Sequence, residues 1–193
     1  DVISSMLGAA RSMAVENRSY AGVHVQLDAD RNCWVAVMKY DNGTGKFVSV
    51  GGFPPQRMPA DMAFGQISDD YVDGGGNYKS DVNADLRGFT TFNVIFAPDG
   101  SLMTGLVNGS VPQVETGVKI FGGDGATKEQ QIWDHPASLP PGPNINEPGV
   151  GAITSFHYKT LEAMSDANRL KWLEKNGQFL CINQYTGKLL PTK

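Results

Sequence analysis

The sequence contains few of the residues that build metal and redox sites. It has two cysteines, Cys33 and Cys181, and three histidines among 193 residues. The cysteines form no C-x-x-C pair and no histidine lies at ligand spacing beside them, which argues against a thiolate metal centre. Two alternatives stay open. They are a pair of buried free thiols, or a disulfide that would be worth about 4–5 kcal/mol in the chain-entropy model for so long a loop.

Positive charge is also sparse. Lys and Arg total 16 against 20 acidic residues, so the formal net charge is −4. Neutralising phosphate groups requires clustered Lys and Arg, and the sequence has no such cluster, which argues against a general nucleic-acid or anionic-membrane binder. No apolar run reaches the roughly 20 residues that a membrane-spanning helix needs.

Glycine and proline are abundant, with 23 and 11 residues, and helical periodicity occurs only at the start of the chain and near its end. This combination favours a β-rich fold with long loops. The length suits one domain with a substantial core. We therefore expect a single domain over residues 1–193, of the α+β class, in which an N-terminal α-helix packs on antiparallel β-sheet with long loop insertions.

The first 27 residues carry the clearest pattern. Apolar residues recur at the three-and-four spacing of one helix face, at Ile3, Met6, Leu7, Ala10, Met13 and Ala14. Near Tyr20 the period changes to two, and Val23, Val25 and Leu27 alternate with His24 and Gln26. The pattern predicts a helix that leads directly into a half-buried strand.

A hairpin should follow. Trp34–Tyr40 and Phe47–Val50 have strand composition, and Asp41-Asn42-Gly43 between them is strong turn chemistry because Asn and Gly tolerate positive φ. Three prolines within residues 51–62 then interrupt regular structure, so this segment should cross an edge or an end of the sheet.

A second hairpin is expected around residues 92–102. Phe92–Phe96 alternates as a strand, Pro98-Asp99-Gly100 predicts a tight turn, and the chain can return as a partner strand from Leu102.

The intervening segment, residues 69–85, is polar and holds Asp69, Asp70, Asp73, Asp81 and Asp85. Its carboxylates and glycines could surround a calcium ion. Because the EF-hand spacing and the terminal Glu are missing, a solvated loop is the favoured interpretation.

Residues 108–151 contain two further candidates. The run "FGGDGATKEQQ" lacks both the P-loop spacing and a G-x-G-x-x-G after a strand, so it does not predict a phosphate site. Trp133, Asp134 and His135 place an aromatic ring, a carboxylate and an imidazole together, but no nucleophile or ion partner is identifiable. A tryptophan that anchors a proline-rich loop explains these residues more simply.

The C-terminal part predicts a strand at Ala152–Tyr158 and one helix over "TLEAMSDANRLKWLEKNG", lying on the sheet and ending at Gly177. A strand at Phe179–Asn183, a turn and a short return complete the chain.

Three of these segments resemble type IV pilin-like proteins, in particular minor pseudopilins and minor pilins of the GspH and FimT kind. They are Ala10-Arg11-Ser12 followed by Arg18 and the strand Val23–Leu27, then Phe96-Ala97-Pro98-Asp99-Gly100, and then Thr186-Gly187-Lys188 in the last strand pair. DNA-binding members of the FimT kind carry a Gly-Arg-x-Arg pattern at the last site. Here Lys188, Leu189 and Leu190 stand there, so the resemblance does not extend to DNA uptake.

The resemblance implies a non-enzymatic structural subunit of a type II secretion pseudopilus or a type IV pilus, without a cofactor. Such subunits are made as prepilins, held in the inner membrane by an apolar helix that would precede residue 1, and exposed to the periplasm or the cell surface. Their partners are other pilin or pseudopilin subunits, which pack through their helices. The assembly face would comprise Ile3, Leu7, Ala10 and Ala14, between the chain's own sheet and neighbouring helices.

Two alternatives belong to other classes. A secreted β-sandwich module that binds carbohydrate or another surface ligand would use exposed aromatic residues such as Trp133, Tyr71 and Tyr78. A small hydrolase would use His135 or His157 with nearby carboxylates. The sequence encoded before residue 1 would distinguish a pilin from a module with an ordinary signal peptide.

Overall fold

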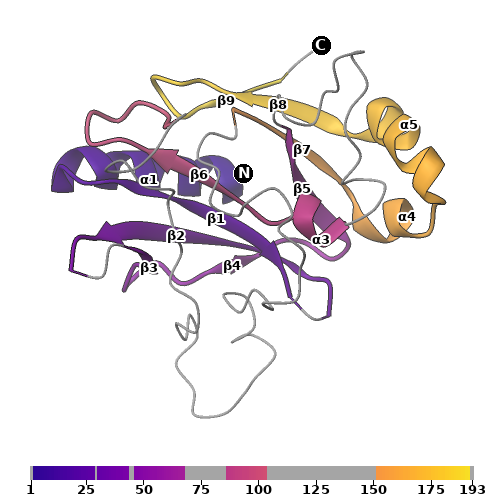
Figure 1. Cartoon of the computed structure of the whole chain (residues 1–193), viewed down its shortest axis with the longest axis horizontal. Coiled ribbons are helices and arrows are strands. Elements are labelled where there is room, and N and C mark those ends of the chain that lie inside the picture. Colours follow the sequence, from indigo (N-terminus) through magenta and orange to yellow (C-terminus); the bar gives the residue numbers. More distant parts are fainter. Residues whose placement is uncertain (1, 29, 44–45, 68–85, 104–150, 192–193) are drawn as a thin grey trace.

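The computed structural model describes residues 2–28, 30–43, 46–67, 86–103 and 151–191. These residues form an α+β fold in which one long helix lies against antiparallel sheet (Figure 1). In chain order the helices are α1 (Val2–Asn17), α3 (Leu86–Phe89), α4 (Tyr158–Glu162) and α5 (Asp166–Asn176). The strands are β1 (Ala21–Leu27), β2 (Cys33–Asp41), β3 (Lys46–Ser49), β4 (Gln56–Arg57), β5 (Met62–Ile67), β6 (Phe92–Phe96), β7 (Ala152–His157), β8 (Gln178–Ile182) and β9 (Leu189–Pro191).

The first sheet has the order β3-β2-β1-β6, and β4 pairs with β2 beside β3. The predicted meander of three strands is confirmed, since β1 pairs with β2 from Ala21↔Lys39 to Leu27↔Cys33, and β2 pairs with β3. At the hairpin turn the backbone N–H of Gly43 donates to Asp41 Oδ1 at 3.0 Å. The proline-containing segment differs from a plain crossing because it contributes β4 to the same sheet.

The turn between β1 and β2 is organised by Asp28. Its carboxylate accepts hydrogen bonds from the backbone N–H of Asn32, the Asn32 amide and Trp34 Nε1, at 2.8 to 2.9 Å. Burial alone would raise the pKa of Asp28, but these donors outweigh it and hold the pKa below its usual value. Three donors on one carboxylate fix the exit of β1 relative to the start of β2.

The second sheet has the order β5-β7-β8-β9. Sequence patterning missed β5, which pairs with β7 from Met62↔His157 to Ile67↔Ala152. The ring of Phe89 in α3 lies so close to Gly65 in β5 that a Cβ there would come within 2.1 Å of it. The same ring contacts Phe156 with centroids 5.6 Å apart, so α3 docks on this sheet through an aromatic side chain.

Helix α1 contacts β1, β2 and β6 of the first sheet. Its inner side chains share one apolar core with residues of the second sheet, among them Ile153, Leu180 and Ile182. Burying so many aliphatic side chains in one cluster supplies the main stabilisation of the fold, at roughly 25 cal/mol per Å² of apolar surface.

The prediction of one helix between residues 160 and 177 is wrong in one respect, because the structure has two helices there. Chain direction changes at Ser165, whose extended conformation (φ −64°, ψ 147°) makes it the N-cap of α5. Gly177 ends α5 as predicted. A Cβ at Gly177 would lie 2.7 Å from the Leu173 carbonyl oxygen, so the close approach of the chain requires glycine there.

Candidate functional site

The four residues predicted to form an assembly face lie on the inner side of α1. Ile3, Leu7, Ala10 and Ala14 are each at most 1% exposed and belong to the main apolar core. They therefore pack against the chain's own sheet. Any contact of α1 with a neighbouring molecule has to come from its exposed side, where Val2 and Val15 are 37% and 44% exposed.

On α1 the side chain of Arg11 reaches the turn after β6. Arg11 Nε donates a hydrogen bond of 3.0 Å to the carbonyl oxygen of Gly100. The turn is closed by the N–H of Gly100 donating to the Ala97 carbonyl oxygen at 2.8 Å, and by Asp99, which accepts from Ser101. Gly100 has φ +80°, so the left-handed position of this turn is filled by the residue that tolerates it best.

The same arginine also lies against the turn between β8 and β9. A Cβ at Gly187, where φ is +67°, would stand 3.0 Å from the Phe96 ring and 3.4 Å from Arg11 Cδ. The N–H of Leu102 donates to the Gln184 carbonyl oxygen at 2.8 Å, which joins the two turns directly. We call Arg11, Gly100 and Gly187 the Arg11 junction.

The Arg11 junction brings together the three segments that carry the pilin resemblance. Gly100 lies 89 residues after Arg11 in the sequence, and Gly187 follows Gly100 after a similar interval. Sequence reasoning identified each segment but had no signal for their contact, because nothing local in a sequence reports which turns meet a helix.

The second face of β1 is not solvated, which contradicts the expected half-buried strand. His24 and Gln26 are 1% and 6% exposed, and Asn93 on the neighbouring strand is 2% exposed. His24 Nδ1 lies 2.7 Å from Asn93 Oδ1, and His24 Nε2 lies 3.0 Å from Gln26 Oε1. Polar side chains on a strand can thus be buried when they satisfy one another.

Burial lowers the pKa of His24, although its hydrogen bonds to Gln26 and Asn93 act in the opposite direction. The neutral ring that burial favours carries a single N–H. One of the two neighbouring amides must therefore turn its NH₂ group toward the imidazole. The three side chains hold the sheet together, and the ring is enclosed rather than presented to a ligand.

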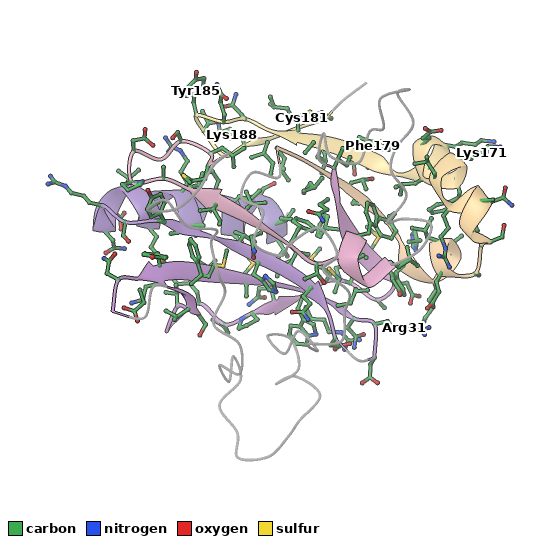
Figure 2. The ribbon with its side chains drawn as sticks, viewed as in Figure 1. Arg31, Lys171, Phe179, Cys181, Tyr185 and Lys188 are labelled. Atoms are coloured by element: carbon green, nitrogen blue, oxygen red, sulfur yellow. The ribbon has the colours of Figure 1, made fainter. Side chains whose placement is uncertain are left out.

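Both cysteines are free thiols in the structure. Cys33 is buried in β2, and burial raises its pKa to about 12 against the opposing effect of a backbone hydrogen bond from Phe64. Cys181 is half-buried in β8, and Figure 2 shows it beside Phe179 on that strand. Of the two alternatives left open by the sequence, the structure shows the unlinked pair.

Several predicted candidates lie outside the described residues. They are the acidic segment 69–85, the "FGGDGATKEQQ" run, the aromatic residues Tyr71, Tyr78 and Trp133, and the Asp134–His135 pair. Within the described ranges no three His, Cys, Asp or Glu side chains are placed to hold a metal ion. His157 is exposed at the end of β7, and Asp61, on the segment that pairs beside it, forms an ion pair with Lys159 at 2.6 Å.

A groove of about 470 Å³ opens between the C-terminal end of α1 and the β2–β3 hairpin. Its floor is a row across three strands, Ala21, Lys39 and Val48, which the sheet register places opposite one another. Met13 and Asn17 in the last turn of α1 form one wall. The groove exists because α1 covers β1, β2 and β6 and ends at Asn17, so it does not cover the adjacent part of β3.

The rim of the groove includes Ser19, Tyr20, Tyr40, Asp41 and Asn42. The two tyrosine rings meet edge to face at 5.9 Å and pack with Phe47 on the opposite face of the sheet, so they do not offer their faces to the groove. The polar lining thus comes from Lys39 and the hydroxyl, amide and carboxylate groups around it.

No helix in the described part of the chain is both long and apolar enough to cross a bilayer. Comparison of the chain with family models, with curated proteins and with solved structures gives no match.

Proposed function

We propose that this protein is a non-enzymatic structural subunit, a minor pilin or pseudopilin of a type IV pilus or type II secretion pseudopilus. The observation that carries the proposal is the Arg11 junction. The three segments that resemble pilin-like proteins lie apart in the sequence, yet one arginine of α1 contacts the turns that contain the other two. If the three resemblances were coincidental, there would be no reason for these segments to contact one another in the fold.

The architecture supports the same role. An N-terminal helix whose inner face is fully buried against its own sheet, and whose outer side keeps Val2 and Val15 exposed, can continue from a preceding membrane segment. The Arg11 junction then couples that helix to the rest of the domain, because a displacement of α1 acts directly on both turns. In this proposal the partners are other pilin-like subunits, and the domain faces the periplasm or the cell surface.

The decisive experiment is membrane fractionation of the full-length native protein with N-terminal sequencing of its mature form. A membrane-held product that begins with a processed apolar helix is the expected result. A product that fractionates freely and begins near residue 1 would contradict the proposal.

Cysteine cross-linking tests contact through the exposed side of α1 in the same membranes. Cysteines replace the exposed Ser5 or Ser12 of α1 in a Cys181→Ser background, and Lys171→Cys on α5 serves as the matched control. Figure 2 shows Lys171 far from the turn that carries Tyr185 and therefore from the Arg11 junction. Cross-linked species should form from the α1 positions and not from α5. Equal cross-linking at all three positions would argue against assembly through α1.

A further inference from the structure

We propose that the groove between α1 and the β2–β3 hairpin binds a neutral, hydroxyl-rich ligand of the saccharide class. This proposal does not rest on the assembly role above, and neither the sequence pattern nor the pilin resemblance points to this part of the molecule. The groove volume of about 470 Å³ falls within the range of small-molecule sites.

Three polar side chains of the groove have no partner within the described part of the chain. Within the described residues, the side chains of Ser19, Lys39 and Asn42 form no hydrogen bond or ion pair. All three line the groove. Together they offer a hydroxyl, an ammonium and an amide, which can donate to ligand hydroxyl oxygens, while the hydroxyl and amide can also accept.

The lining of the groove carries one positive and one negative side chain. Lys39 and Asp41 lie two residues apart on the same face of β2 and contribute one positive and one negative charge. A groove with balanced charge has no strong preference for an anion or a cation. It therefore favours a neutral ligand that makes many hydrogen bonds over a phosphate, an acidic peptide or a polyamine.

Apolar and polar groups both line the groove. Met13 and Val48 supply aliphatic surface from the helix wall and the sheet floor, and Asn17, Lys39 and Asn42 supply polar groups. A sugar ring presents C–H groups and hydroxyl groups on different sides, so this lining matches it. The floor is hydrogen-bonded sheet, and on the helix wall Asn17 Nδ2 donates to the Met13 carbonyl oxygen at 3.0 Å.

The test is a two-dimensional NMR titration of the isotopically labelled chain with methyl α-glucoside, methyl α-mannoside, N-acetylglucosamine and lactose. At least one should shift the amide resonances of residues 17–20 and 39–43 with millimolar affinity. The Lys39→Ala/Asn42→Ala double variant should bind about tenfold more weakly, because two hydrogen-bonding groups are removed. Both positions are exposed, so the variant should fold.

Lys171→Ala on α5 is the matched control and should bind like the unmodified chain. The proposal is overturned if none of the four sugars shifts groove resonances, or if the double variant binds as tightly as the control. It is equally overturned if hexaglutamate shifts these resonances and the sugars do not, which would identify an anion site around Lys39. None of these outcomes bears on membrane fractionation, so the two proposals fail independently.

Discussion

Arg11 and Gly100 are joined by a hydrogen bond of 3.0 Å from the guanidinium Nε to the backbone carbonyl oxygen, across 89 residues of sequence. The bond is partly buried, and a charged donor makes it stronger than a bond between neutral groups. The aliphatic part of the same side chain packs against Gly187. A single side chain therefore fixes α1 relative to the turns after β6 and β8.

Arg11→Ala should lower the free energy of unfolding by about 1.5–3 kcal/mol, because it removes a charge-assisted hydrogen bond and the packing of the arginine stem. Arg11→Lys keeps the charge but not the geometry of Nε, and should recover only part of the loss. Urea unfolding measures both. Arg18→Ala, at an exposed arginine just beyond α1, is the control and should change stability by less than about 0.5 kcal/mol. Equal effects at Arg11 and Arg18 would show that the Arg11 junction makes no specific contribution to the free energy of unfolding.

Replacing glycine by alanine should have opposite effects on stability at Gly100 and Gly8. Gly100→Ala places a Cβ at φ +80° and within 2.8 Å of Val15 Cγ2, so it should destabilise by about 1–3 kcal/mol. Gly8→Ala adds a methyl group to an exposed helical position with no atom within 4 Å, so it should stabilise by about 0.5–1 kcal/mol. Thermal unfolding of the two variants tests both signs. A stabilising Gly100→Ala would show that the turn after β6 does not hold its conformation in solution.

The parts of the fold that sequence could predict are those set by local patterning. The apolar spacing from Ile3 to Ala14 predicted α1, and the Asp41-Asn42-Gly43 turn predicted the β2–β3 hairpin. Pro98-Asp99-Gly100 likewise forms the expected turn, followed by the return of Leu102 beside Phe96. In each case the information lies in a short stretch of neighbouring residues, where steric and hydrogen-bonding preferences act directly.

The incorrect predictions have a common physical cause, because the structure at each of these positions depends on a segment that is distant in the sequence. His24 and Gln26 looked solvated because alternation reports a difference between faces and not what covers the second face. The strand β5 was missed because Gly65 interrupts its pattern, and only the ring of Phe89 explains why glycine is needed. The split between α4 and α5 was predictable in principle, since Ser165-Asp166 is a helix-start signal within the run.

The candidate site was likewise predicted only where the information is local. The segments of the Arg11 junction were identified from sequence, but their contact was not. The groove could not be foreseen at all, because it depends on where α1 ends relative to the outer strand β3.

The two thiols should differ strongly in reactivity. Cys33 is buried with a pKa of about 12, so almost no thiolate exists near neutral pH, whereas Cys181 is half-buried on β8. Iodoacetamide treatment of the folded protein, followed by peptide mass spectrometry, should show modification of Cys181 well before Cys33. Repeating the reaction in denaturant is the control, and both should then react at similar rates. Modification of Cys33 at the rate of Cys181 in the folded state would mean that the region between the two sheets opens readily.

The buried His24 predicts how stability depends on pH. Burial places its pKa in the folded protein below the ordinary value of 6.5, so between these two values the unfolded chain binds more protons than the folded one. The free energy of unfolding should therefore fall as the pH is lowered through about 6.5, by up to about 1.4 kcal/mol per pH unit from this group. Urea unfolding between about pH 7.5 and pH 5.5 measures the slope.

His24→Gln removes the titrating group while retaining one hydrogen-bonding amide, and should flatten that slope even if it lowers stability at every pH. His157→Gln alters an exposed histidine and should keep the slope of the unmodified protein. The comparison isolates His24, because a general effect of acid on the carboxylates would persist in both variants. If His24→Gln keeps the full slope, the imidazole binds protons equally in the folded and unfolded chain, and the slope belongs to another group.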